Sequence, residues 1–251
     1  MNIFIFGILI LILYLCCMVI NVQYKGDTSI ANFTWGGGVL IVALYTFFTL
    51  SNFLARQIIL TTMIALWAGR LIIYVYKRYT GHDPRFNSWK WQGFKALIIN
   101  IIWVFGQSTM IAIMSTPVFL VNSNQIPGLN LIDLCGILLW IFGFCWEAIS
   151  DQQLFNFMKN PNNKGKVMDK GLWYYSRHPN YFGEIVMWWS IYLIALSMPK
   201  GWISIIAPIT ITFLLIFVTG IPLLEKAMKN NSAYQEYKKR TSILIPWFSK
   251  K

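Results

Sequence analysis

Residues 171–198 read GLWYYSRHPNYFGEIVMWWSIYLIALSM, so that a cationic, aromatic and polar stretch passes directly into an apolar one. The apolar part, 181–198, is close to the roughly 20 residues that an α-helix needs to cross a bilayer. Pro179 suits the first turn of that helix, where its missing N–H would have no partner anyway. The stretch predicts a membrane helix with polar side chains at its entrance. These are Arg177, His178, Asn180, Tyr181 and Glu184.

The rest of the chain is similarly apolar. Of its 251 residues, 57% are hydrophobic and 12% are charged, whereas about a quarter of a soluble domain is charged. Helices satisfy their own backbone in hydrocarbon, and the apolar segments are too long for barrel strands. The sequence predicts an all-α integral membrane protein, a seven-transmembrane-helix bundle that forms one domain over 1–251. The expected spans are 3–20, 33–50, 56–76, 96–119, 129–149, 181–198 and 202–222.

The net charge of +12 is unevenly placed. With seven spans, 18 of the 21 Lys and Arg residues fall in loops on the same side as the C-terminus. Arg56 and Lys200 fall on the other side, and Arg70 lies inside the third span. Cytoplasmic loops carry such an excess, so we expect the N-terminus outside and the C-terminus in the cytoplasm. This placement indicates membrane topology and not a nucleic-acid partner.

The entrance at 177–184 has the features of an anion site. Arg177 and His178 precede a helix whose first N–H groups and dipole attract negative charge. Asn180 and Glu184 are four residues apart and share a helix face. Gly183 leaves that face open to a flat ring or to another backbone. The alternative is a helix cap with side chains that reach toward the headgroups.

Two further groups of polar residues lie near the cytoplasmic ends of predicted spans. In WEAISDQQ, Glu147 and Asp151 share a face, and carboxylates can accept hydrogen bonds from ribose hydroxyls. In LWAGRLIIYVYKRY, Arg70 lies within a span, with Tyr74 one turn nearer the cytoplasm. Ionisable residues inside a membrane are costly and mark candidate functional positions.

The segment 223–251 predicts a basic, amphipathic cytoplasmic tail around LLEKAMKNNSAYQEYKKR. A basic helix on anionic headgroups explains its lysines, but it does not explain Tyr234 and Tyr237. The two histidines, His82 and His178, are far apart in sequence, and thiolate clusters are absent from the loops, so no metal site is expected. The combined features suit a phosphate-bearing cofactor from the cytoplasm and a lipid from the bilayer.

GLWYYSRHPNYFGE, with EAISDQQ before it and YQEYKKRTSILIPWF after it, resembles the steroid 5-alpha-reductase-like family of membrane reductases, in its bacterial-type branch. SIANFTWG at 29–36, LWAGRLIIYVYKR at 66–78 and GHDPRF at 81–86 also fit that branch. The resemblance implies a seven-helix bundle and NADPH-dependent reduction of a carbon–carbon double bond conjugated to a ketone. It implies a lipid or steroid-like substrate in an integral multi-pass protein. The membrane would be the inner membrane of a bacterium or the endoplasmic reticulum of a eukaryote.

The same resemblance implies roles for individual residues. Asn180 and Glu184 would line the nicotinamide end of the cofactor, and Asp151 would hold a ribose or amide group. Arg177, Lys239 or Arg240 would hold phosphates, for which the planar fork of Arg is well suited. The remaining positions predicted on the cofactor side are Arg70, Tyr74, Glu147, His178 and Tyr237.

The chain departs from the family at the proton donor. The family holds the ketone with a Glu on an early helix and a Tyr three residues before the Arg of the next. Here 28–82 contain no Asp or Glu, and Trp67 stands three residues before Arg70. Tyr45, Tyr74 and Tyr181 are the candidate donors, and Glu184 is a further catalytic candidate.

Two other functions stay open from the sequence. RHPxY also occurs in isoprenylcysteine carboxyl methyltransferases, so an S-adenosylmethionine-dependent lipid or prenylcysteine methyltransferase is the alternative enzyme. S-adenosylmethionine is cationic and has no phosphates, whereas NADPH needs several cations. The density of Lys and Arg near 170–180 and 226–240 favours NADPH. A transporter or scaffold would bind neither cofactor.

Overall fold

The computed structural model describes residues 12–16, 31–78 and 94–249. Throughout these residues every regular element is a helix, which confirms the all-α class. Within the described part of the chain, three helical segments are long and apolar enough to cross a membrane: Ala55–Lys77, Leu131–Lys159 and Gly201–Ala227. A fourth span results if the bent pair Val104–Met114 and Thr116–Ser123 crosses as one. The chain is therefore a multi-pass membrane protein that is all-helical over the residues described.

The predicted count of seven spans is not confirmed. The first expected span, 3–20, lies mostly outside the described residues. The apolar helix Trp35–Leu50 falls short of full spanning length. Helix α8 (Pro179–Leu196) has 18 residues, but its first two turns carry Asn180 and Glu184 and lower its hydropathy.

The chain divides into two compact units, of which the first comprises 1–133 and 194–207. Its described helices are α2 (Ala31–Leu50), α3 (Ala55–Arg78), α4 (Phe94–Met114), α5 (Thr116–Ser123) and the short helix η4 (Gly201–Ile205). Helix α2 packs against α3, α4 and α5. A Cβ built on Gly36 would lie 3.5 Å from the Cα atom of Ala68, so the small glycine lets α2 and α3 approach each other closely.

The predicted span 96–119 is bent by 48° between α4 and α5. Pro117 has no N–H to donate to the carbonyl of Ile113. The Thr116 hydroxyl donates to that carbonyl instead, at 2.8 Å. The predicted span is therefore present as a bent pair of helices, because Pro117 removes a backbone hydrogen bond at this point.

A polar centre lies in the same unit. Arg56 of α3 donates from Nε and Nη2 to the two carboxylate oxygens of Asp133, at 2.8 and 2.6 Å. Both side chains are buried, and Arg56 Nη1 also donates to the carbonyl of Ile126 at 3.1 Å. Gln57 accepts from the backbone N–H groups of Asn52 and Leu54. These contacts fasten the loop 50–55 and the segment 124–133 to the start of α3.

The second unit comprises 134–193 and 208–251. It contains most of α6 (Leu131–Lys159), the turn η3 (Pro161–Asn163), α7 (Leu172–Tyr175) and most of α8. After α9 (Ile206–Phe213) come the π-helical turn η5 (Leu214–Val218), α10 (Ile221–Ala227) and α11 (Ser232–Arg240). Helix α6 continues ten residues beyond its predicted end at 149, because no Pro or Gly interrupts it before Asn160 and Pro161.

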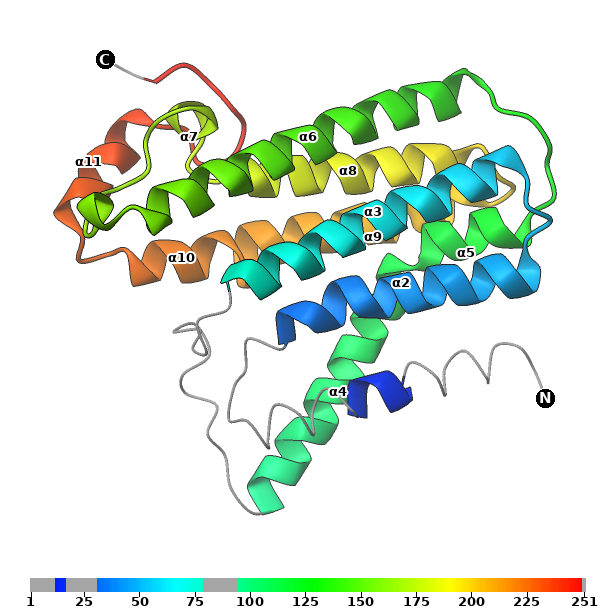
Figure 1. Cartoon of the computed structure of the whole chain (residues 1–251). Helices are drawn as coiled ribbons and strands as arrows, with labels where there is room; N and C mark the ends of the chain where they lie inside the picture. Colours follow the sequence, from blue (N-terminus) through cyan, green and yellow to red (C-terminus); the bar gives the residue numbers. More distant parts are fainter. Residues whose placement is uncertain (1–11, 17–30, 79–93, 250–251) are drawn as a thin grey trace. The chain divides into compact units, whose positions relative to one another are not determined.

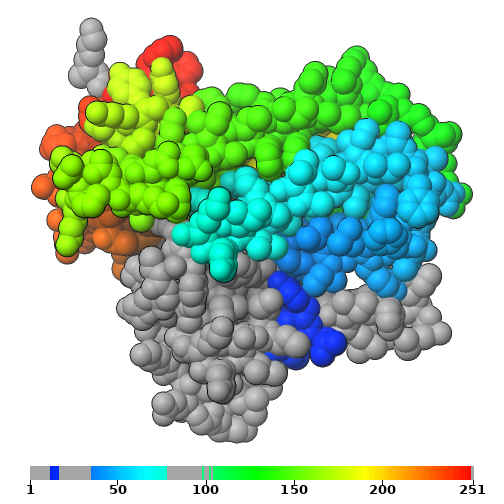
Figure 2. All heavy atoms as spheres, in the orientation of Figure 1, coloured from blue at the N-terminus to red at the C-terminus, as the bar shows by residue number. Residues whose placement is uncertain are grey.

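The tail is not one helix. Helix α10 ends at Ala227, and Asn231 caps the start of α11, since its side chain accepts a hydrogen bond from the N–H of Tyr234 at 3.1 Å. From Leu131 to Ile149, the large side chains exposed on α6 are apolar, among them Leu134, Leu138, Ile141, Phe142 and Ile149. Helix α6 forms part of the face of the molecule that Figure 2 shows. Lipid is the natural neighbour of such a surface.

Helices α6 and α8 run side by side (Figure 1) and meet at two glycines. A Cβ built on Gly183 would lie 2.7 Å from the carbonyl oxygen of Gly143 and 2.8 Å from the backbone nitrogen of Glu147. Of the two readings for Gly183, the close approach of another backbone is therefore the correct one.

Candidate functional site

The segment before α8 is fastened to the end of the chain. Ser176 accepts from the N–H of His178 at 3.1 Å and donates from its hydroxyl to the carbonyl of Leu244 at 2.8 Å. The N–H of Arg177 donates to the carbonyl of Ser242 at 2.8 Å, and the N–H of Trp247 donates to the carbonyl of Tyr175 at 3.0 Å. The tail therefore fixes the backbone that carries Arg177 and His178.

Arg177 is buried and lies in an ionic cluster that the sequence did not reveal. Its Nη1 donates to Oε1 of Glu225 on α10, while Lys238 on α11 donates from Nζ to Oε2 at 2.5 Å. Glu225 and Lys238 were not predicted, because the spacing of charges in a basic tail does not show which ones turn inward. Burial, and then the charge of Glu225, raise the pKa of the neighbouring Tyr234 to about 12.

His178 is buried beside the cluster. Its ring stacks on that of Tyr181, with the ring centroids 5.4 Å apart and the planes 4° from parallel. Its Nε2 lies 3.8 Å from Oε1 of Glu225, which is too long for a hydrogen bond. Burial lowers the pKa of His178 to about 4; Glu225 opposes that shift and Arg177 adds to it. His178 is therefore neutral at pH 7.

This pKa predicts a loss of stability in acid. Above pH 6.5 the side chain is neutral in both states, whereas between pH 6.5 and 4 the unfolded chain binds a proton that the folded chain does not. The free energy of unfolding should fall by about 2 kcal/mol from pH 7 to pH 5 on this account. Thermal or chemical unfolding in detergent would measure it. The fall in the free energy of unfolding between pH 7 and pH 5 should be smaller in His178→Gln than in the wild type. Equal falls in the two proteins would show that His178 is not its cause.

Asp151 and Asn180 come together across α6 and α8. Asn180 Nδ2 donates to Oδ1 of Asp151 at 3.3 Å, and Asp151 is buried. Glu147, one turn earlier on α6, is also buried and packs where the two helices cross at Gly183. Further along α8, Glu184 accepts a hydrogen bond from the indole N–H of Trp188 at 2.9 Å. The structure therefore brings 147, 151, 180 and 184 to one helix pair.

Tyr237 was predicted to face the cofactor, but its hydroxyl donates into the loop before α8. It contacts the carbonyl oxygen of Trp173 and, at 3.1 Å, that of Ser176. Burial raises the pKa of Tyr237 above its ordinary value, so the hydroxyl keeps its proton. These contacts identify Tyr237 as a support for the loop.

Tyr237→Phe should lower the free energy of unfolding by about 1–3 kcal/mol, because two buried carbonyls lose their donor. Tyr174→Phe is the matched control, since Tyr174 is exposed. Thermal unfolding of both variants in the same detergent checks this. A Tyr237→Phe protein as stable as the control would argue against the supporting role.

Lys239 and Arg240, the predicted phosphate ligands of the tail, make surface pairs. Lys239 lies 2.6 Å from Glu236, and Arg240 lies 2.5 Å from Asp169. Exposed ion pairs of this kind contribute little free energy, so neither pair holds its cation strongly in place. It is Lys238, between Tyr237 and Lys239, that reaches the cluster around Arg177.

Arg70 and Tyr74 on α3 and Tyr45 on α2 belong to the first unit, and the other predicted residues belong to the second. A site that joins residues of the two units therefore stays a prediction.

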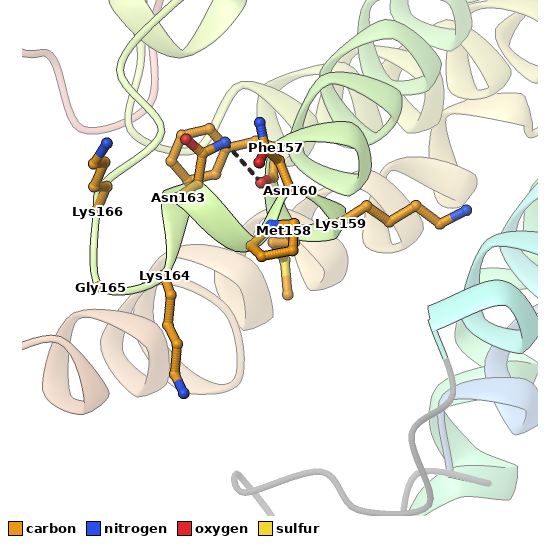
Figure 3. A pocket seen from close by; sticks show the side chains of 9 residues that line it. Phe157, Met158, Lys159, Asn160, Asn163, Lys164, Gly165 and Lys166 are labelled. Carbon is orange, nitrogen blue, oxygen red and sulfur yellow. Dashed lines mark hydrogen bonds between the residues drawn. The ribbon is translucent and has the colours of Figure 1, made fainter.

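A surface hollow of about 390 Å³ follows the end of α6 (Figure 3). Lys159, Lys164 and Lys166 lie around it, and Asn163 donates from its side chain to the carbonyl of Phe157 at 2.9 Å. It contains none of the predicted site residues. Over 12–16, 31–78 and 94–249, no three His, Cys, Asp or Glu side chains form a group that could hold a metal ion.

Comparison with known proteins supports the resemblance. The model of the family described as "Protein of unknown function (DUF1295)" matches residues 18–241. Over 118 residues the chain is 31% identical to 3-oxo-5-alpha-steroid 4-dehydrogenase 1 of Bos taurus. The aligned region covers 45% of this chain and 41% of that protein. The chain thus spans about two fifths of the length of this curated relative. No solved structure matches. The chain belongs to the DUF1295 family and is a steroid 5-alpha-reductase-like protein.

Proposed function

We propose that the chain is an NADPH-dependent membrane oxidoreductase that acts on CH–CH groups. It would reduce the conjugated double bond of an enone, in a steroid-like or other lipid substrate, by hydride transfer. The observation that carries the proposal is the set of polar side chains where α8 begins beside α6. Arg177 and Asp151 are buried, and the half-buried Asn180 contacts Asp151. The similarity to a 3-oxo-5-alpha-steroid 4-dehydrogenase supports the reaction class.

The residues fit a phosphate-bearing dinucleotide. Arg177 Nε and His178 Nε2 are buried and have no hydrogen-bond partner among the described residues. Buried polar atoms are normally paired, and phosphate oxygens would accept from Arg177 in the bidentate manner that a guanidinium favours. The amide of Asn180 and the carboxylate of Asp151 offer a donor and acceptors for ribose hydroxyls or a carboxamide.

Each side chain then has a defined part in the mechanism. Arg177 binds phosphate, Asp151 and Asn180 orient the ribose and nicotinamide end, and Trp188 holds Glu184 in place. NADPH, when bound, supplies the hydride that the β-carbon of the enone receives. The Tyr181 hydroxyl would donate a proton to the ketone oxygen as negative charge develops there, and Tyr74 is the second candidate donor.

We also propose seven spans with the N-terminus outside, because the uneven placement of Lys and Arg favours that topology. The site would then open to the cytoplasm, where NADPH is available. In a bacterium the protein would lie in the inner membrane, and in a eukaryote it would lie in the endoplasmic reticulum.

Isotope transfer tests the reaction. The protein in lipid nanodiscs would be incubated with NADPH deuterated at the transferable C4 position and with conjugated ketones of steroid and other lipid classes. We expect deuterium at the β-carbon of the reduced product by mass spectrometry. Reduced product without deuterium, in the presence of fully labelled cofactor, would contradict direct hydride transfer.

Asn180→Ala should raise the Kd for NADPH about tenfold or more, because it removes an amide from the centre of the proposed site. Asn156→Ala is the matched control, since Asn156 is exposed on α6 and pairs with Gln152. Both Kd values come from fluorescence titration of the purified proteins. Equal affinities in the two variants would exclude Asn180 from the site.

A further inference from the structure

Glu225 is the residue that links three parts of the second unit. It lies on α10, and its two carboxylate oxygens contact Arg177, which precedes α8, and Lys238 on α11. The Glu225 side chain is 15% exposed and that of Arg177 is 6% exposed, so the pair is largely shielded from water. The Lys238 side chain is 45% exposed, which leaves part of its ammonium group accessible.

The cluster carries more positive charge than it neutralises. One carboxylate faces two cations, and the neighbouring His178 is neutral at pH 7. Arg177 Nε lacks a hydrogen-bond partner among the described residues, although Nη1 is bound to Glu225. An uncompensated cation and an unpaired donor in a shielded position together favour an anionic ligand with oxygen acceptors.

We propose that Glu225 is a positioning residue that holds Arg177 and Lys238 together so that both bind one phosphate group of the cofactor. This inference rests on the proposed function. The carboxylate fixes the guanidinium through Nη1 and leaves Nε for the phosphate. It also holds α11 through Lys238, whose remaining protons are free for the same ligand.

This role makes a prediction whose sign separates it from simple electrostatics. A carboxylate beside a phosphate repels it, so that its removal should tighten binding if only charge mattered. If Glu225 positions the two cations, its removal should weaken binding even though the site becomes more positive. The two accounts therefore give opposite changes in Kd.

The experiment uses the full chain in detergent and two probes, NADPH and inorganic pyrophosphate. We expect Glu225→Ala to raise the Kd of both probes about tenfold. We expect a smaller rise in Glu225→Gln, whose amide oxygen can still accept from Arg177. Glu236→Gln is the matched control, since Glu236 is exposed and pairs with Lys239. Lys238→Met should weaken the binding of both probes, whereas Lys229→Met, at an exposed lysine with no predicted part in the site, should not.

Thermal unfolding of each variant shows whether it folds. If Glu225→Ala does not fold, the Kd values of Glu225→Gln and Lys238→Met test the positioning role instead. Unchanged or tighter binding in the folded Glu225 variants overturns the proposal. If the wild type binds pyrophosphate and not NADPH, the proposed function fails, and the pyrophosphate titrations still decide the role of Glu225. A wild type that binds neither probe overturns both.

Discussion

Replacing Arg56 with alanine should lower the free energy of unfolding by about 3–5 kcal/mol. The change leaves the fully buried carboxylate of Asp133 without the two hydrogen bonds from its guanidinium partner. An uncompensated charge in such a place is far more costly than a missing surface pair. Chemical or thermal unfolding in detergent or nanodiscs gives the measurement.

Two further proteins make this test specific. Lys77→Ala, at the exposed end of the same helix, should change stability little. The double variant Arg56→Met with Asp133→Leu should recover much of the loss, because neither charge is then left alone. A single Arg56→Ala variant within about 1 kcal/mol of the wild type would refute a structural role for this pair.

Gly183→Val should destabilise the second unit by about 3 kcal/mol or more, at the upper end of overpacking costs. Any Cβ at 183 meets backbone atoms of Gly143 and Glu147 within 2.9 Å, and backbone atoms cannot rotate away. Helices α6 and α8 would have to separate, which would also break the contact between Asn180 and Asp151. The affinity for NADPH should therefore fall together with the thermal midpoint.

Gly69→Ala is the control for this substitution. Nothing lies within 4 Å of a Cβ built on Gly69 in the middle of α3. Alanine there should raise stability by about 0.5–1 kcal/mol, because glycine is a poor helix former. A Gly183→Val protein that unfolds like the wild type would show that the two helices do not meet at these glycines.

The sequence was sufficient for the helical class and for the positions of most helices. Apolar run length predicts 33–50 and 56–76 closely, and α2 and α3 differ from them by at most two residues at either end. Where the prediction missed, a local backbone effect decided the outcome. Pro117 bends one span, and Asn231 starts a separate helix in the tail by capping α11.

The site was predictable where its residues are close in sequence or share a helix face. Asp151 and Asn180 were both expected, and they contact each other. Glu225 and Lys238 were missed, because their contacts with each other and with Arg177 depend on how α10 and α11 fold back onto 173–178. Tyr237 was recognised as unusual, although its contacts are with the loop backbone. No spacing rule reports such tertiary packing.

The measurement that tests the central claim most directly is a titration of the purified protein with NADPH and, separately, with S-adenosylmethionine. The transfer of energy from tryptophan to the reduced nicotinamide reports the binding of NADPH. A shift in the thermal midpoint reports the binding of either cofactor. We predict saturable binding of NADPH that is lost in Arg177→Ala, with no shift caused by S-adenosylmethionine. Saturable binding of S-adenosylmethionine without binding of NADPH would contradict the account.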